Sequence, residues 1–436
     1  MTEEDADDNH GFDTRCVHSG QRSDPATGAA AVPIHQTSSY EFEDAERAAE
    51  LYRLEELDHV YSRISNPTVE VLETRLANLH GAAGAVATAS GMAALDAATS
   101  LLASAGDNVV AASSIYGGTQ SYLSTMASRR GVEARYVDTL EPDAYADAID
   151  ERTAYVHFET LGNPALTTPP MEAIASRAHE RGVPVFVDNT FATPALCRPF
   201  EHGADLVWES TTKWIHGSGT TIGGALLESG EFPWAAYPGR FPEIAAPNPA
   251  FDGKTFTEAF GERAFTVAAR NRAVRSLGDQ QSPFDAWATL QGLETLALRM
   301  ERHSQNAARL AAHLETHDGV AWVAYPGLET HETHATASRY LDGYGGMIAF
   351  GLTGGFEAAR RLCESVELIT FLANIGDARS LIIHPASTTH AQLSTEDQRA
   401  AGVRPDLLRF SVGIESPADV IADLDRGIAR AQGEVA

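Results

Sequence analysis

The chain has 436 residues, which is room for two or three domains, and 43% of them are apolar, as expected for a globular protein with a large core. Its 60 acidic and 32 basic residues give a formal net charge of −28, which excludes nucleic acids and anionic membranes as expected partners because both would repel this surface. We therefore expect a small-molecule substrate.

Composition also predicts a cell compartment. The three cysteines have no paired spacing, which argues against a disulfide framework or a thiolate metal site. The first residues are acidic without an apolar core, and no apolar run reaches the roughly 18 residues of a membrane span. We expect a cytoplasmic protein. Dispersed acidic residues and a near absence of lysine favour a cytoplasm rich in salt, with an ordinary acidic mesophilic protein as the alternative.

The predicted elements begin after an irregular arm. Residues 1–65 contain prolines, glycines and polar runs and no convincing core of their own. From residue 66, helix-like segments rich in Ala and Leu alternate with short apolar runs at 109–112, 154–158, 183–187 and 205–208. This alternation predicts an α/β fold with a mainly parallel sheet buried on both faces, which we assign to a domain over residues 66–290.

The second half predicts a smaller α/β domain over residues 291–436. Its strand candidates are 320–323, 347–350, 380–383 and 408–412, and an apolar periodicity near the end predicts a terminal helix. Before it, a proline-rich insertion over 231–262 is expected to be an ordered surface loop near the site. Residues 284–315 have apolar side chains at spacings of three and four and predict one long helix that bridges the two domains.

Only two lysines occur, Lys213 and Lys254, whereas 30 of the 32 basic residues are arginines. A desolvated primary amine forms a Schiff base and a guanidinium does not, so a chain that has nearly eliminated lysine is expected to keep one where this chemistry is needed. Lys213 follows an apolar strand and a cluster of hydroxyls, and is the candidate. Lys254 lies in a loop-like segment without these features and serves as an internal control.

Polar residues at two further strand ends complete a candidate anion and cofactor site. Asp188 ends the apolar run 183–187, where a buried carboxylate needs a cationic or hydrogen-bonding partner; a helix cap is the alternative. The turn at residues 90–92 precedes an Ala-rich helix, so its backbone N–H groups are suited to a phosphate, although such a turn is often a simple N-cap. The hydroxyls of Ser210 and Thr212 are placed to bind the same phosphate, and Tyr116 to lay its ring on a planar cofactor.

Seven segments of the chain, in family order, then form a recognisable pattern. They are residues 61–68, 90–93, 116–119, 162–164, 187–190, 210–213 and 408–415. On these motifs the chain resembles the pyridoxal-phosphate enzymes of cysteine and methionine metabolism over nearly its whole length. The resemblance implies the aspartate-aminotransferase-like fold (fold type I), with residues 66–290 as the domain that binds pyridoxal 5'-phosphate.

The resemblance also implies roles for individual residues. Lys213 would carry the cofactor as a Schiff base, Asp188 would hold the pyridine nitrogen protonated, and Tyr116 would stack on the ring. The phosphate would be bound by the amides of Gly91 and Met92 with Ser210 and Thr212, and by Tyr61 and Arg63 reaching in from a neighbouring subunit. Asn163 would lie beside the phenolic oxygen of the cofactor, and Arg409 and Ser387 would bind the α-carboxylate of the substrate. Sites shared between chains imply at least a dimer, and the family is usually tetrameric.

Within the family the chain is most similar to the sulfhydrylases that use O-acetylhomoserine. The grounds are residues 219–224, the insertion around 247–253 and residues 376–390, while Ser218 departs from the histidine expected in this branch. The implied reaction is a γ-replacement in which sulfide displaces acetate to give homocysteine. The alternatives are the enzymes that form or cleave cystathionine, and the methionine γ-lyases, which tend to have cysteine where Gly117 follows Tyr116.

Two alternative functions from other protein classes are less well supported by the sequence. A nicotinamide-dependent oxidoreductase lacks its glycine fingerprint in this chain, and an inactive cofactor-binding scaffold is disfavoured because no catalytic position is lost. His331 and His334 lack the helical spacing of a zinc site, so no metal is expected. His216, His384 and His390 are expected near the pocket, in orienting or structural roles.

Overall fold

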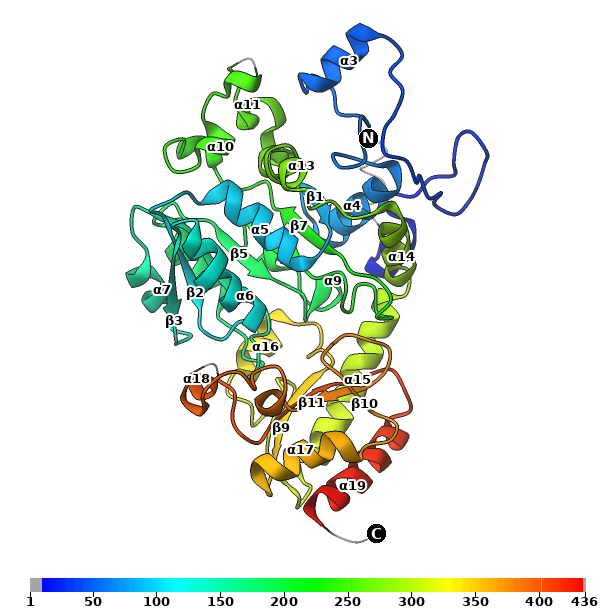
Figure 1. Cartoon of the computed structure of the whole chain (residues 1–436), viewed down its shortest axis with the longest axis vertical. Coiled ribbons are helices and arrows are strands. Elements are labelled where there is room, and N and C mark those ends of the chain that lie inside the picture. Colours follow the sequence, from blue (N-terminus) through cyan, green and yellow to red (C-terminus); the bar gives the residue numbers. More distant parts are fainter. Residues whose placement is uncertain (1–9, 252, 401, 434–436) are drawn as a thin grey trace.

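The computed structural model describes residues 10–251, 253–400 and 402–433 (Figure 1). Seven strands form the larger sheet in the order β1-β7-β6-β5-β4-β2-β3. Their bounds are β1 Gly84–Thr88, β2 Asn108–Ala112, β3 Glu133–Val137, β4 Thr153–Glu159, β5 Val185–Asp188, β6 Leu206–Glu209 and β7 Gly224–Glu228. Strands β2 to β6 pair in parallel, whereas β7 runs antiparallel to β1 and β6. The prediction of a mainly parallel sheet is confirmed.

Burial explains why these strands read as continuous apolar runs. Every residue of β2, β4, β5, β6 and β7 is buried, as in sheets covered on both faces. The covering helices include α4 Pro67–His80, α5 Gly91–Leu102, α6 Gly117–Ser121, the π-helix η1 Tyr122–Ala127, α7 Pro142–Ala148, α8 Met171–His179, α9 Thr193–Leu196 and the 3-10 turn η2 Pro199–His202. Asn66 caps α4 by accepting from the N–H of Thr68, and Pro67 occupies its first turn, where no N–H is needed.

The arm is more structured than its sequence predicts. It contains α2 Phe12–His18 and α3 Ala45–Tyr52, and Cys16 is buried in the main core. Residues 1–9 of the expected arm lie outside the described residues. In Figure 1 the segment that carries α3 extends beyond the compact body of the molecule, at the end away from the smaller sheet.

The proline-rich insertion corrects one expectation. Instead of a loop it folds into short turns, η3 Trp234–Ala236, α10 Pro242–Ala245, η4 Pro249–Phe251 and α11 Phe256–Phe260. Its aromatic rings pack together, with ring centroids 4.6 Å apart for Phe232 and Trp234 and 5.0 Å apart for Trp234 and Phe241. The chain then continues through η5 Gly261–Arg263, α12 Ala264–Ala268, the π-helix η6 Ala269–Val274 and α13 Arg275–Leu277. No described residue of 231–262 is among those that line the cavity of the candidate active site, and the expectation that this segment lies near the site stays a prediction.

The predicted long helix is interrupted. It consists of α14 Pro283–Leu293 and α15 Leu296–Glu315. Gly292 is pressed against the backbone of His216, where an added Cβ would lie 2.3 Å from the carbonyl oxygen. At the break the carbonyl of Gly292 accepts from the N–H of Thr295 at 3.3 Å and from the guanidinium of Arg299 at 2.7 Å. A tertiary contact therefore divides the helix, although its apolar spacing is continuous.

The smaller sheet has five strands in the order β10-β11-β12-β9-β8. Their bounds are β8 Val320–Ala324, β9 Met347–Leu352, β10 Thr370–Phe371, β11 Leu381–Ile383 and β12 Leu407–Ser411. The accompanying helices are α16 His334–Tyr340, α17 Gly355–Ser365, η7 Pro385–Ser387, α18 Thr395–Ala400 and α19 Pro417–Gln432. The four predicted strands and the terminal helix are confirmed, and this half has a separate hydrophobic core around Phe350 and Phe410. Among the described residues, no helix has the length and apolarity needed to cross a membrane.

Candidate active site

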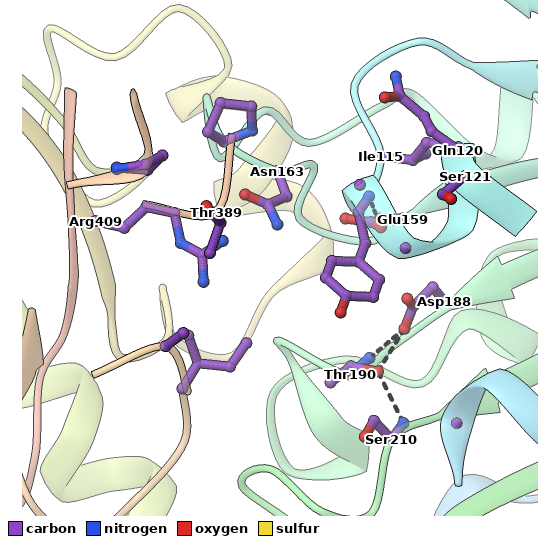
Figure 2. A pocket seen from close by; sticks show the side chains of 18 of the residues that line it. Ile115, Gln120, Ser121, Glu159, Asn163, Asp188, Thr190, Ser210, Thr389 and Arg409 are labelled. Atoms are coloured by element: carbon purple, nitrogen blue, oxygen red, sulfur yellow. Dashed lines mark hydrogen bonds between the residues drawn. The ribbon is translucent and has the colours of Figure 1, made fainter. Parts of the chain in front are cut away.

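A cavity of about 740 Å³ lies where the carboxyl ends of β4, β5 and β6 face loops of the smaller sheet. This is the edge at which ligands bind in open α/β sheets. Figure 2 shows Asp188, Thr190 and Ser210 on one side of the pocket and Arg409 and Thr389 on the opposite side. Most of the site residues predicted from the sequence line this cavity: Gly91, Met92, Tyr116, Asn163, Asp188, Ser210, Thr212, Lys213 and Arg409.

Lys213 follows β6 and points its amine into the cavity. Its Nζ donates to Oδ1 of Asn374 at 2.6 Å. Burial, and secondarily the positive charge of Arg409, lower the pKa of this amine from 10.5 to about 8. A substantial fraction is therefore neutral near physiological pH, which is the form that attacks a carbonyl. Lys254, in contrast, is exposed.

Asp188 ends β5 in a fully enclosed position. Its Oδ1 accepts from the N–H of Thr190 at 2.9 Å and from the hydroxyl of Thr190 at 2.6 Å. The same hydroxyl accepts from the N–H of Ser210 at 2.9 Å, so β5 and β6 together fix the carboxylate (Figure 2). Burial raises the pKa of Asp188 to about 7, and the hydrogen bonds from Thr190 oppose this. A cation bound in the cavity would restore the charged form.

The N-terminus of α5 forms a cradle for an anion. Ser90 caps the helix by accepting from the N–H of Ala93 at 3.1 Å, which leaves the first amides directed at the cavity. A Cβ added to Gly91 would lie 2.9 Å from Cβ of Ser210 and 2.9 Å from the ring of Trp208, so only glycine fits here. The Thr212 hydroxyl accepts from the N–H of Gly223 at 3.0 Å, which holds it beside this cradle.

Tyr116 and Asn163 are linked through a residue that the sequence reasoning missed. Glu159 ends β4 and is buried, and its Oε1 accepts from the backbone N–H of Tyr116 at 2.5 Å. Burial and the neighbouring Asp188 raise the pKa of Glu159 well above its ordinary value. The signal was present, because a carboxylate ends a buried strand here as Asp188 does one strand further along the sheet. Tyr116 itself is 45% exposed and free to cover a flat ligand.

Arg409 lies on β12 and directs its guanidinium at the cavity. Its Nε is inaccessible to solvent and has no hydrogen-bond partner among the described residues. Ser387 is absent from the lining of the cavity, and its hydroxyl lies 2.8 Å from Nδ1 of His384. The residue that faces Lys213 from the smaller sheet is Asn374 instead, in a loop after β10. No sequence signal distinguished Asn374, which approaches Lys213 from 161 positions away.

Tyr61 and Arg63 are also absent from the lining of this cavity. Within the chain they interact with each other, with the Arg63 guanidinium carbon 4.9 Å from the centroid of the Tyr61 ring. Arg63 Nε donates to the carbonyl of Arg275 at 3.0 Å, and Tyr61 is 39% exposed. A single chain therefore does not bring them to its own site.

The residues present fit pyridoxal phosphate. One cavity offers an amine of lowered pKa, a carboxyl group that requires a cation, a glycine cradle at a helix N-terminus, and a guanidinium without a hydrogen-bond partner among the described residues. These match respectively the aldehyde, the pyridine nitrogen and the phosphate of the cofactor, and the carboxylate of an amino acid. The fold and site thus define an enzyme that uses pyridoxal phosphate on amino acids.

Comparison with known proteins specifies the family. The model of the "Cys/Met metabolism PLP-dependent enzyme" family matches residues 13–429, and the chain belongs to this family. It is 47% identical over 419 residues to a homocysteine synthase of Schizosaccharomyces pombe, covering 96% of this chain and 98% of that protein. It is also 47% identical over 421 residues to O-acetyl-L-homoserine sulfhydrylase 1 of Thermus thermophilus, covering 96% and 100% respectively.

A solved structure agrees in both fold and cofactor. A putative O-acetylhomoserine (thiol)-lyase from Campylobacter jejuni superposes with a TM-score of 0.92 at 39% sequence identity, covering 96% of this chain and 100% of that one. That crystal structure contains a pyridoxyl-lysine monophosphate. The expected fold type and the expected cofactor are confirmed.

Proposed function

We propose that the protein catalyses the γ-replacement of O-acetylhomoserine by sulfide, which yields homocysteine and acetate. The observation that carries the proposal is the amine of Lys213, whose pKa is lowered to about 8 in the same cavity as Asp188 and Arg409. The relatives named homocysteine synthase and O-acetylhomoserine sulfhydrylase support this choice over the cystathionine enzymes and methionine γ-lyases.

The cofactor would be held by the residues that the site brings together. Lys213 would bind its aldehyde covalently, Asp188 would pair with its protonated pyridine nitrogen, and the Tyr116 ring would cover its face. The amides of Gly91 and Met92 and the hydroxyls of Ser210 and Thr212 would hold the phosphate, and Asn163 would bind near the phenolic oxygen. When bound, pyridoxal phosphate supplies a conjugated system that stores the negative charge created as the substrate loses protons.

The substrate would be oriented by the smaller sheet. Arg409 is suited to a carboxylate, because a guanidinium donates two parallel hydrogen bonds to it. We place Asn374 beside Arg409 in place of Ser387, since the Asn374 amide faces Lys213. The pair fixes the α-carbon over Lys213, whose amine then removes the α-proton and later returns it. Tyr116 assists these transfers, and Glu159 holds the backbone that carries its ring.

We also propose that residues 1–65 of one subunit complete the site of its neighbour, through Tyr61 and Arg63, in a homotetramer built from such pairs. The support is that both residues lie outside the cavity of their own chain and that the arm extends from the body (Figure 1). Mixing inactive Lys213→Ala chains with inactive Arg63→Ala chains tests this arrangement. Recovered activity in the mixture supports it, and no recovery despite mixed assembly contradicts it.

We infer from composition that the protein acts in a cytoplasm rich in salt. The support is the formal net charge of −28 and the replacement of nearly all lysines by arginines. Activity and melting temperature measured against KCl concentration test this inference. Both should rise toward molar salt, and full activity without salt would contradict it.

The function itself is tested by direct assay. We expect homocysteine and acetate from O-acetylhomoserine with sulfide, at a kcat/KM well above that for breakdown of cystathionine or methionine. O-succinylhomoserine and cysteine serve as the competing leaving group and nucleophile. Preference for cystathionine or methionine as substrate would overturn the proposal in favour of the alternatives.

A further inference from the structure

His390 lies in the wall of the cavity, on the loop that follows η7. The backbone of this loop is fixed, because the His390 N–H donates to the carbonyl of Pro385 at 3.0 Å and its own carbonyl accepts from Nε2 of Gln398 at 2.9 Å. On the imidazole, Nδ1 lies 2.9 Å from the hydroxyl of Thr389. If the hydroxyl accepts, Nδ1 carries the proton and Nε2 presents a lone pair.

The other ring nitrogen faces the loop that carries Tyr116. A Cβ built on Gly117 would lie 3.7 Å from Nε2 of His390, an ordinary van der Waals distance, so the imidazole lies close to this loop. Nε2 has no hydrogen-bond partner among the described residues, and it is not an enclosed atom. It is therefore available to a small molecule that enters the cavity.

Besides His390, the titratable groups of the cavity wall are Tyr116, which we propose assists Lys213, and four charged or acidic groups that are already hydrogen-bonded or cannot act as a base. Lys213 donates to Asn374, Glu159 accepts from the N–H of Tyr116, and Asp188 is held by Thr190. Arg409 cannot accept a proton, and its positive charge together with partial burial lowers the pKa of His390 below the ordinary 6.5. His390, the one histidine in this lining among the described residues, is thus neutral at pH 7.

We propose that His390 is the base that takes the proton of the incoming sulfur nucleophile. The inference rests on the proposed γ-replacement and adds a residue that activates its second substrate. Only the deprotonated sulfur is an effective nucleophile, so a neutral imidazole in the wall increases the supply of the reactive form.

The proton balance of this step is complete. The S–H bond of hydrogen sulfide breaks and an N–H bond forms at Nε2 of His390. Acetate has by then left the γ-carbon with the C–O electron pair, after the substrate has lost its protons. The electron pair left on sulfur forms the bond to the γ-carbon of the remaining carbon–carbon double bond, and the electrons of that double bond take up a proton at the β-carbon. The imidazolium then returns its proton to solvent.

The test is His390→Gln, which keeps a polar side chain of similar reach but has no titratable nitrogen. We expect kcat/KM for sulfide in the variant to follow the ionised fraction of sulfide, falling about tenfold per pH unit below the pKa of hydrogen sulfide. In the wild type, kcat/KM for sulfide should stay nearly constant as the pH falls, until His390 itself is protonated. The two should converge at alkaline pH, where sulfide is already ionised.

Two further readouts separate a chemical role from a structural one. The cofactor dissociation constant, and the change in cofactor absorbance when O-acetylhomoserine is added without sulfide, should be the same in both proteins. His313→Gln, at a histidine of α15 that lies outside the cavity lining and 2.7 Å from Asp425 Oδ1 through its Nε2, is the matched control and should follow the wild type at every pH.

A deficit of His390→Gln that is equal at all pH values, or no deficit at all, would overturn the assignment to His390. Failure of the wild type to form homocysteine would instead overturn the proposed function. The two failures are thus distinguishable.

Discussion

The two lysines of the chain lie in regions that differ in where their neighbouring residues come from. Lys213 lies where three parallel strands end and where a loop of the smaller sheet approaches, so its surroundings come from distant parts of the sequence. Lys254 lies in the insertion, where its neighbours are local. Its N–H donates to Phe251 at 3.0 Å, and the rings of Phe251 and Phe256 stack at 5.5 Å. Lys213 is partly buried and Lys254 is exposed.

The difference shows what reactivity requires in this fold. A local aromatic cluster forms in the insertion but leaves the amine of Lys254 exposed to water. Convergence of strand ends removes water from Lys213 and places a carboxyl group and a guanidinium in the same cavity. Chemistry is therefore expected to depend on Lys213 and its converging partners, and not on Lys254.

The largest effect is expected from exchanging each lysine for arginine. Lys213→Arg should abolish turnover and the visible absorbance of covalently bound cofactor, because a guanidinium does not form the link. Lys254→Arg should leave kcat, KM and the spectrum unchanged. Steady-state kinetics and absorbance spectra of the two purified variants provide the measurement. Loss of activity in the second variant alone would reverse the comparison.

Asp188→Asn should have the next largest effect. The amide is nearly isosteric but does not stabilise a protonated pyridine nitrogen, so kcat should fall by roughly 100-fold or more, the scale of losing one preorganised electrostatic partner. Far-UV circular dichroism controls for folding. An Asp188→Asn protein with wild-type kcat would show that this strand end does not act on the cofactor.

A smaller change is expected at the wall formed by the smaller sheet. Arg409→Lys keeps the positive charge but loses the pair of parallel hydrogen bonds that a guanidinium donates to a carboxylate. Loss of a hydrogen bond to a charged group costs about 1.5–3 kcal/mol of binding free energy. KM for O-acetylhomoserine should therefore rise roughly 10- to 100-fold, with little change in cofactor affinity. Equal weakening of cofactor and substrate binding would instead assign Arg409 to the cofactor.

The smallest effect is a pH dependence that separates the lysines without mutation. The pKa of Lys213 is lowered to about 8, so the neutral amine should accumulate as pH rises through about 8. The rate at which cofactor-free protein binds pyridoxal phosphate covalently should rise over this range and then level off. Stopped-flow absorbance measures it. A rise that continues toward 10.5 would show that the cavity does not lower the pKa of Lys213.

The sequence predicts the reactive region well wherever the signal is local. Lys213, Asp188 and Gly91 each follow a strand or begin a helix, and such positions can be read from neighbouring residues. Glu159 carried the same signal and was missed. The partner Asn374 could not be found in this way, because only the tertiary fold brings its loop to Lys213.

The sequence does not predict the elements whose form depends on tertiary contacts or on a second chain. The break between α14 and α15 results from packing of Gly292 against His216, which no periodicity reveals. The turns of the insertion form around clustered aromatic rings. The prolines of this segment predict a loop instead. The roles of Tyr61 and Arg63 depend on a second chain, and they stay predictions.

The central claim is that one of the two lysines carries the cofactor, and borohydride reduction tests it most directly. The protein is purified with pyridoxal phosphate, reduced, digested and analysed by mass spectrometry. We predict a phosphopyridoxyl adduct on the peptide that contains Lys213 and an unmodified Lys254. An adduct confined to Lys254, or no adduct in protein reduced with the cofactor present, would contradict the account.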